Sequence, residues 1–193
     1  ESYGSDITIT SVGDITSNDR GLFVWNSGIG ETNITSSGKV TASNSAGIYA
    51  EHSETSSADD IKISVKDVDA QAEGIYAKNN GSGVTNVTVT GTVQGGATSF
   101  EGILATGSSA KIIVANTATV SGGAEGVETG AKADTVTVNG SVTGLNGTAI
   151  LLGGGDDTVN IGSTAKITGT IDGGMGSDTT NFLVSWFTVD SFT

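Results

Sequence analysis

Gly47-Ile48-Tyr49-Ala50 is the stretch that decides the fold, because it returns along the chain almost unchanged. In a strand, successive side chains point to opposite faces, so Ile48 and Ala50 would face one side and Tyr49 the other. The same pattern recurs at 21–24, 74–77, 102–105 and 126–129, and in a degenerate form at 148–152. A pattern that returns at this spacing indicates stacked structural repeats.

Two further short strands accompany this element in each repeat. The first is an alternating apolar strand at 7–9, 32–34, 61–63, 87–89, 112–114, 136–138, 159–161 and 182–184. Its second apolar position advances by 25, 29, 26, 25, 24, 23 and 23 residues. The second element follows at 13–16, 38–41, 91–93, 118–121, 140–143 and 165–168. Three strands per repeat predict an all-β fold, a right-handed parallel β-helix (β-solenoid) of about seven to eight coils.

A stack of coils explains how so short a repeat can fold. One coil cannot bury its apolar side chains alone, but neighbours about 4.8 Å above and below pair every strand and close the interior. We expect glycine at the corners to permit turns with positive φ. The alternative is a β-sandwich with many short strands, which would show hairpin signals and no fixed recurrence of 23–29 residues. The recurrence favours one solenoid domain over 1–193, with 167–193 as a terminal coil or cap.

Composition limits the functions that this solenoid can have. The chain has 193 residues, a formal charge of -13 and only eight Lys and Arg, which argues against nucleic-acid binding. It contains no Cys, so neither disulfides nor a Cys-ligated zinc site can form. No stretch approaches the roughly 18 apolar residues of a membrane helix.

One glycine-rich segment carries a family resemblance. Residues 167–179 read Ile-Thr-Gly-Thr-Ile-Asp-Gly-Gly-Met-Gly-Ser-Asp-Thr, and 152–159 form a similar junction one coil earlier. These segments resemble the junctions in passenger regions of autotransporters, the type V secreted proteins of Gram-negative bacteria. The resemblance implies a fragment of a longer passenger region at the bacterial cell surface, attached to the outer membrane through a C-terminal β-barrel that this sequence does not contain. It also implies an adhesin, or a scaffold for adhesive loops.

The outward position of the third strand predicts a binding surface. It reads Phe23, Tyr49, Tyr76 and Leu104 in the first four coils, and then Glu128 and Leu151. An exposed apolar patch of this kind often marks a binding site. We expect this stripe to bind a host surface protein or a glycan, or a second copy of the chain. The alternative is that a neighbouring loop covers the stripe and enlarges the core.

Calcium is the one cofactor that the sequence suggests. Residues 173–178, Gly-Gly-Met-Gly-Ser-Asp, fit the start of a calcium-binding nonapeptide, in which carboxylates and turn carbonyls supply the oxygen ligands. Asp157 and Asp178 lie 21 residues apart and are expected to stack on adjacent coils. The motif occurs once and not in tandem, so the alternative is a glycine-rich corner with no ion.

The sequence contains few residues that are suited to catalysis. The single His52 lies in a predicted acidic loop at 51–60, and without Cys there is no plausible nucleophile with its base. We therefore expect no enzyme. The alternatives are a carbohydrate-active β-helix lyase or hydrolase that uses carboxylates, and an inert spacer. The acidic pairs Asp67 with Asp69 and Glu125 with Glu128 have no Arg nearby and are interpreted as solubilising charge.

Ice binding is a further possibility that the predicted alignment of coils does not support. Thr-x-Thr recurs at 8–10, 88–90 and 135–137, and ranked threonines on a flat face can order water. The aligned outward positions read Thr8, Asn33, Lys62, Thr88, Ile113, Thr137 and Asn160. This series is not periodic.

Overall fold

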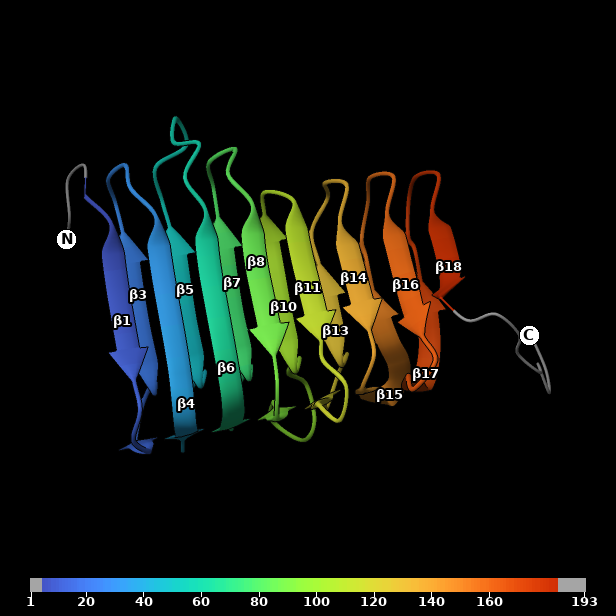
Figure 1. The fold of residues 1–193 in the computed structure, drawn as a ribbon, viewed down its shortest axis with the longest axis horizontal. Coiled ribbons are helices and arrows are strands. Elements are labelled where there is room, and N and C mark those ends of the chain that lie inside the picture. The colour runs from blue at the N-terminus through green and yellow to red at the C-terminus, as the bar shows by residue number, and fades with distance from the viewer. Residues whose placement is uncertain (1–4, 184–193) are drawn as a thin grey trace.

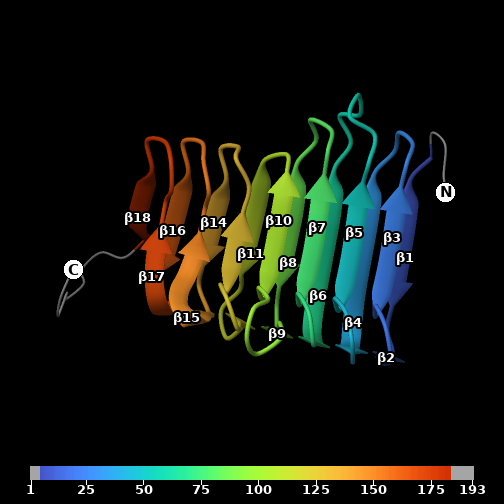
Figure 2. The same cartoon turned by 180° about the vertical axis from the view of Figure 1, so that it is seen from behind.

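The fold is a stack of parallel strands with three faces. The structure, a computed structural model, describes residues 5–183. The chain runs down the first face, crosses the second and returns up the third as it advances toward the C-terminus, which is the right-handed sense (Figure 1; Figure 2). The predicted all-β right-handed parallel β-solenoid is confirmed, with about seven turns. Of the predicted terminal coil or cap, the part beyond residue 183 lies outside the described residues.

Each face is one ladder of parallel strands, and the following strands make up the three ladders. The first face contains β1 (Ile7–Ser11), β4 (Thr32–Ala42), β6 (Ile61–Ala70), β8 (Thr85–Val89), β11 (Ala110–Val114), β14 (Thr135–Val138), β16 (Thr158–Gly162) and β18 (Thr179–Leu183). The second contains β2 (Ile15–Ser17), the ends of β4 and β6, β9 (Thr92–Gln94), β12 (Thr119–Gly122) and the starts of β15 (Ser141–Leu151) and β17 (Lys166–Asp172). The third contains β3 (Leu22–Asn26), β5 (Ile48–His52), β7 (Ile75–Asn79), β10 (Ile103–Gly107), β13 (Val127–Thr129) and the ends of β15 and β17.

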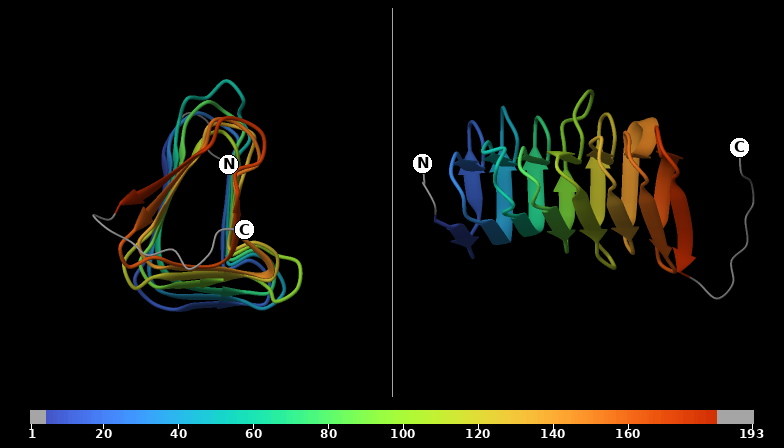
Figure 3. Two further views of the ribbon diagram at one scale, coloured as in Figure 1. Left: turned by 90° about the vertical axis from the view of Figure 1, so that its right-hand side faces the viewer. Right: turned by 90° about the horizontal axis from the view of Figure 1, so that it is seen from above.

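The core is a set of vertical columns of β-branched and small side chains. On the third face Ile48, Ile75 and Ile103 stack directly on one another and are fully buried. The view along the axis shows the successive coils superimposed around this interior (Figure 3). Because every strand has a partner in the next coil, side chains from equivalent positions fill the core in the same way along its length.

The glycine before each third strand is required for a reason other than the expected positive φ. Gly74 is not among the glycines with positive φ. A Cβ atom on Gly74 would lie 2.5 Å from the carbonyl oxygen of Gly102 and 2.7 Å from Cγ1 of Val93. This glycine is therefore required because the backbones of adjacent coils approach closely. Positive φ occurs at other corners, for example at Gly107.

The predicted alignment of the first strand is wrong by two residues at two places, between the third and fourth coils and between the last two, where Phe182 pairs with Ile161 and not with Val159. The sequence pattern pairs Ile61 with Val87, but in the structure Ile61 pairs with Thr85 and Ile63 with Val87. An even shift keeps the same side chains inside, so the predicted core is unaffected. The outward positions do change, and they form two columns: Thr8, Asn33, Lys62, Asn86, Lys111 and Thr135 in one, and Thr10, Thr35, Ser64, Thr88, Ile113 and Thr137 in the other. Two lysines and an isoleucine still interrupt these polar columns.

Candidate functional site

The predicted stripe lies in a single column on the third face. Phe23 of β3 pairs in register with Tyr49 of β5, Tyr49 with Tyr76 of β7, and Tyr76 with Leu104 of β10. The column continues through Glu128. Phe23 is 49% exposed, and the other members are partly exposed. In the described part of the chain no segment covers this column, so the alternative of a loop folded over the stripe finds no support there.

The aromatic rings of the stripe stack on one another along the solenoid. The ring centroids of Tyr49 and Tyr76 are 4.7 Å apart with an interplanar angle of 10°, and those of Phe23 and Tyr49 are 5.3 Å apart at 32°. A separation close to the coil repeat means that the ring faces point along the axis, toward each other. The stripe therefore presents mainly ring edges to a partner.

A cation already lies on the aromatic end of the stripe. The guanidinium carbon of Arg20 is 4.9 Å from the ring centroid of Phe23 and 4.6 Å from that of Tyr49. Such contacts are electrostatic attractions between the positive group and the π-electrons of the ring. The N-terminal part of the stripe therefore already holds one planar cation, the guanidinium of Arg20.

Beside the stripe, a second outward column carries a small polar network. Trp25, Glu51 and Lys78 are in register, and Trp25 is 45% exposed. The hydroxyl of Tyr49 donates a hydrogen bond to Oε2 of Glu51 at 2.5 Å, and Nζ of Lys78 lies 3.4 Å from Oε1 of Glu51. Burial raises the pKa of Tyr49, and the hydrogen bond to Glu51 raises it further. The Tyr49 hydroxyl is thus held as a donor, and Glu51 is already paired.

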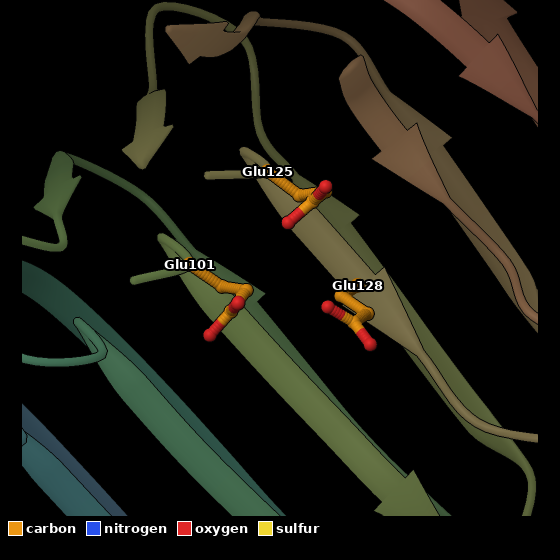
Figure 4. A group of neighbouring side chains, drawn as sticks. All are labelled: Glu101, Glu125 and Glu128. Atoms are coloured by element: carbon orange, nitrogen blue, oxygen red, sulfur yellow. The ribbon is translucent and has the colours of Figure 1, made fainter. Parts of the chain in front are cut away.

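At the other end of the stripe, three carboxylates converge without a basic partner. Glu101 precedes β10, Glu125 occupies the equivalent place one coil later, and Glu128 lies in β13 (Figure 4). One carboxylate oxygen of each lies within 4.8 Å of the others. In residues 5–183 none of the three forms a salt bridge. We call Glu101, Glu125 and Glu128 the acidic patch.

The acidic patch is more than the dispersed solubilising charge that the sequence suggested. Burial raises the pKa of Glu101 and of Glu128, and nearby carboxylates raise both further. Sequence reasoning paired Glu125 with Glu128 and missed Glu101. Aligning the residue before each third-strand glycine, which reads Arg20, Ala46, Glu73, Glu101 and Glu125, would have found it. The patch could supply three oxygen ligands to a hard cation such as Ca²⁺, which takes about six to eight.

Asp157 and Asp178, the predicted calcium pair, do lie on adjacent coils. The neighbouring residues Thr158 and Thr179 are in register, which places the two aspartates one above the other. The carboxylate of Asp178 accepts the backbone N–H of Asp157 at 3.1 Å, and that of Asp157 accepts the N–H of Asp134 at 2.7 Å. Both carboxylates therefore already serve as acceptors for main-chain amides, which favours the glycine-rich corner over an ion site.

A calcium titration tests this pair. We expect millimolar Ca²⁺ to leave the melting temperature unchanged, because an oxygen of each carboxylate is bonded to an amide. Differential scanning calorimetry with EDTA and then with excess Ca²⁺ makes the measurement, and Mg²⁺ serves as the control for ionic strength. A rise in melting temperature that is specific to Ca²⁺ and that persists in the variant E101Q/E125Q/E128Q, which lacks the three glutamates, would instead support the calcium prediction.

His52 was placed in a flexible loop from the sequence, and that placement is wrong. β5 extends through His52, whose side chain is fully buried. Its Nε2 lies 2.6 Å from the carbonyl oxygen of Gly28, and Asn26 and Asn79 occupy the equivalent inward position in the adjacent coils. The loop begins only at Ser53. His52 belongs to a buried polar column at the corner of the solenoid.

Comparisons with known proteins give no further guide to function. No family model, no curated protein and no solved structure matches the chain. Among the described residues, no helix is long and apolar enough to cross a membrane. The function must therefore be argued from the third face itself.

Proposed function

We propose that the chain is an adhesive segment of an extracellular bacterial surface protein, the passenger region of an autotransporter, and that its third face binds a protein partner through cationic side chains. One observation carries the adhesive part of the proposal. The same outward face holds an aromatic column with Arg20 stacked on it and, three and four coils beyond Arg20, three carboxylates that form no salt bridge within residues 5–183. Exposed aromatic groups and unpaired charge on a rigid scaffold are typical of recognition surfaces.

Ring geometry favours a cationic protein segment over a glycan. A sugar packs its apolar face against the face of an aromatic ring, but the faces of Tyr49 and Tyr76 are stacked against each other. A Lys or Arg side chain needs only a carboxylate for its charge and a short apolar surface for its stem. The acidic patch offers the carboxylate, and the adjacent Leu104 offers the apolar surface. The partner that fits this face best is a protein segment rich in Arg or Lys.

Charge argues against lateral self-association through this face. The chain carries a formal charge of -13, so two copies repel each other, and the acidic patch would meet an identical patch in a symmetric dimer whose two-fold axis passes through the patch. Like charges placed opposite each other across an interface are unfavourable. A second copy is therefore a poorer partner than a basic protein.

The extracellular and autotransporter parts of the proposal rest on other features. A chain without Cys that is stabilised by ladders of parallel strands suits export in an unfolded state, and the glycine-rich junctions at 152–159 and 167–179 resemble those of passenger regions. The rival is an inert spacer. Replacing the coils that contain β5, β7, β10 and β13 by unrelated coils of equal length would leave a spacer functional and abolish adhesion.

A binding measurement tests the third face directly. We expect a fluorescent oligo-arginine peptide to bind the purified protein at physiological ionic strength, and the triple variant E101Q/E125Q/E128Q to bind about tenfold more weakly. Three exposed or partly exposed ion pairs at about 0.5 kcal/mol each account for that factor. Fluorescence anisotropy gives both dissociation constants.

A matched variant separates this site from general attraction to an acidic protein. D19N/E54Q/D156N removes the same number of charges from surface carboxylates outside the acidic patch. It should bind the peptide nearly as well as the unmodified protein. If both triple variants lose affinity equally, or if an uncharged glycan probe binds more tightly than the peptide, the proposed partner is wrong.

A further inference from the structure

The corner between the second and third faces carries an exposed bulge that contains an Asn–Gly pair. The register of β15 with β17 is broken between Thr143 and Thr148, and within the described chain residues 145–147 pair with neither adjacent coil. Asn146 and Gly147 are both exposed. Gly147 has a φ of +108°, and no other heavy atom lies within 4 Å of the place where a Cβ would stand. The peptide bond between the two residues is therefore open to solvent and is not held by strand pairing, although the carbonyl of Gly147 accepts the hydroxyl of Thr170 at 3.3 Å.

We infer that Asn146 is a site of spontaneous deamidation. The backbone nitrogen of Gly147, after losing its proton, attacks Cγ of Asn146. The new C–N bond closes a five-membered succinimide, and the side-chain nitrogen leaves as ammonia. Water then adds to one of the two ring carbonyls, and the ring opens to aspartate or isoaspartate. The reaction needs no enzyme or cofactor, but the main chain must be free to bring the nitrogen onto Cγ.

Asn80–Gly81 is the first of two internal controls, because its backbone is held. The N–H of Gly81, which would be the nucleophile, donates to Oδ1 of Asn79 at 3.0 Å. The N–H of Asn80 donates to the carbonyl of His52 at 2.9 Å. Reaction at Asn80 would require both hydrogen bonds to break, so the fold protects it.

Asn139–Gly140 is the second control, and it is held between coils. The N–H of Asn139 donates to the carbonyl of Val114 at 2.8 Å, and the carbonyl of Gly140 accepts from the N–H of Lys166 at 2.9 Å. Gly140 is buried. The chain thus contains the same dipeptide three times, and among the described residues the copy in the bulge is the one without a main-chain hydrogen bond to an adjacent coil.

Deamidation at Asn146 would change one contact between coils. Nδ2 of Asn146 lies 3.4 Å from the carbonyl oxygen of Thr98, which is 48 residues away in the connection between β9 and β10. The product has a carboxylate oxygen where the donor was, so two acceptors would face each other and the chain would gain one negative charge. Isoaspartate also lengthens the main chain by one methylene, which the unpaired bulge can absorb. The expected outcome is a loosened bulge on an intact solenoid.

Mass spectrometry of the aged native protein tests the inference. Cleavage after Lys132 and Lys166 yields one peptide, 133–166, that contains both Asn139 and Asn146. In native protein kept at physiological temperature and mildly alkaline pH, Asn146 should deamidate at least about tenfold faster than Asn139 and Asn80, equivalent to about 1.4 kcal/mol in activation free energy. In urea the three rates should converge. Equal rates in the native protein would overturn the inference.

A product mimic tests the structural consequence separately. N146D has the side chain of the aspartate product from the outset. We expect faster hydrogen exchange in residues 95–101 and no change in the melting temperature. Unchanged exchange in that segment would show that the contact with Thr98 does not hold the connection, and a lowered melting temperature would show that the bulge supports the core.

Discussion

Replacing Ile103 by Ala is expected to lower the free energy of unfolding by about 3 kcal/mol, within the range for Ile to Ala at buried sites. Ile103 is fully buried at the centre of the solenoid, between Ile75 on one side and Val127 on the other. The smaller side chain leaves a cavity that both neighbouring coils line. Close stacking of the backbones prevents those coils from collapsing into the space. Urea denaturation followed by circular dichroism measures the change.

Leu104→Ala is the matched control in the adjacent residue of the same strand. Leu104 points outward and is only partly buried, so its replacement should cost less than about 1 kcal/mol. The large difference between two neighbouring residues follows from the alternation of side chains in a strand. If the two variants were equally destabilised, the inward and outward assignment of the third face would be wrong.

The alternation of side chains explains which parts of the fold could be predicted from sequence. The pattern Gly-Ile-Tyr-Ala identifies the third strand, and β-branched residues at every second position identify the core. The same alternation cannot detect an error of two residues, because such a shift leaves inward residues inward. This is why the core was correct while the outward column containing Thr88 was misaligned with Thr8.

The residues of the candidate site were likewise predictable only in part. Phe23, Tyr49, Tyr76 and Leu104 could be aligned because each follows the same glycine. Glu101 was missed because it precedes that glycine, at a corner where no alternation applies. His52 was misplaced because one His among acidic residues looks like a loop in sequence, and only the neighbouring Asn26 and Asn79 show that the position is an inward polar column.

Several polar residues inside the solenoid bond the main chain at the corners. Asn26 accepts the N–H of Gly28 through Oδ1, and Asn79 accepts that of Gly81 in the same way. At the same corner in later coils, just before the first-face strand, the buried Asp134 and Asp157 each accept an amide from the preceding coil, and the exposed Asp178 does the same. An asparagine such as Asn26 accepts an amide through Oδ1 and donates to a carbonyl through Nδ2. An aspartate at such a corner accepts an amide through one oxygen, and its second oxygen is buried without a donor in Asp134 and Asp157 as far as the described residues show. Buried aspartates should therefore make the C-terminal coils sensitive to pH.

Asp134→Asn is expected to stabilise the protein above neutral pH by roughly 2–3 kcal/mol. Asp134 is 2% exposed, and its Oδ1 accepts the N–H of Ala110 at 2.6 Å, while Oδ2 is buried and has no hydrogen-bond partner among the described residues. Its pKa is raised from 3.8 to about 6, chiefly by burial and in part by the carboxylate of Asp157, against the lowering effect of the Ala110 amide. Asparagine keeps the acceptor at Oδ1 and removes the buried charge.

The sign of the pH dependence follows from that raised pKa. The folded state binds the proton of Asp134 more tightly than the unfolded chain does, so this residue favours folding below pH 3.8 and loses that contribution as the pH rises through about 6. The stability of the unmodified protein should fall across this interval relative to that of the Asn variant, and the two should converge at its acidic end. Asp19→Asn, which removes the same charge at an exposed position, provides the control. Urea midpoints measured across the interval decide the matter, since parallel curves for the Asp134→Asn variant and the unmodified protein would mean that Asp134 does not titrate in this range.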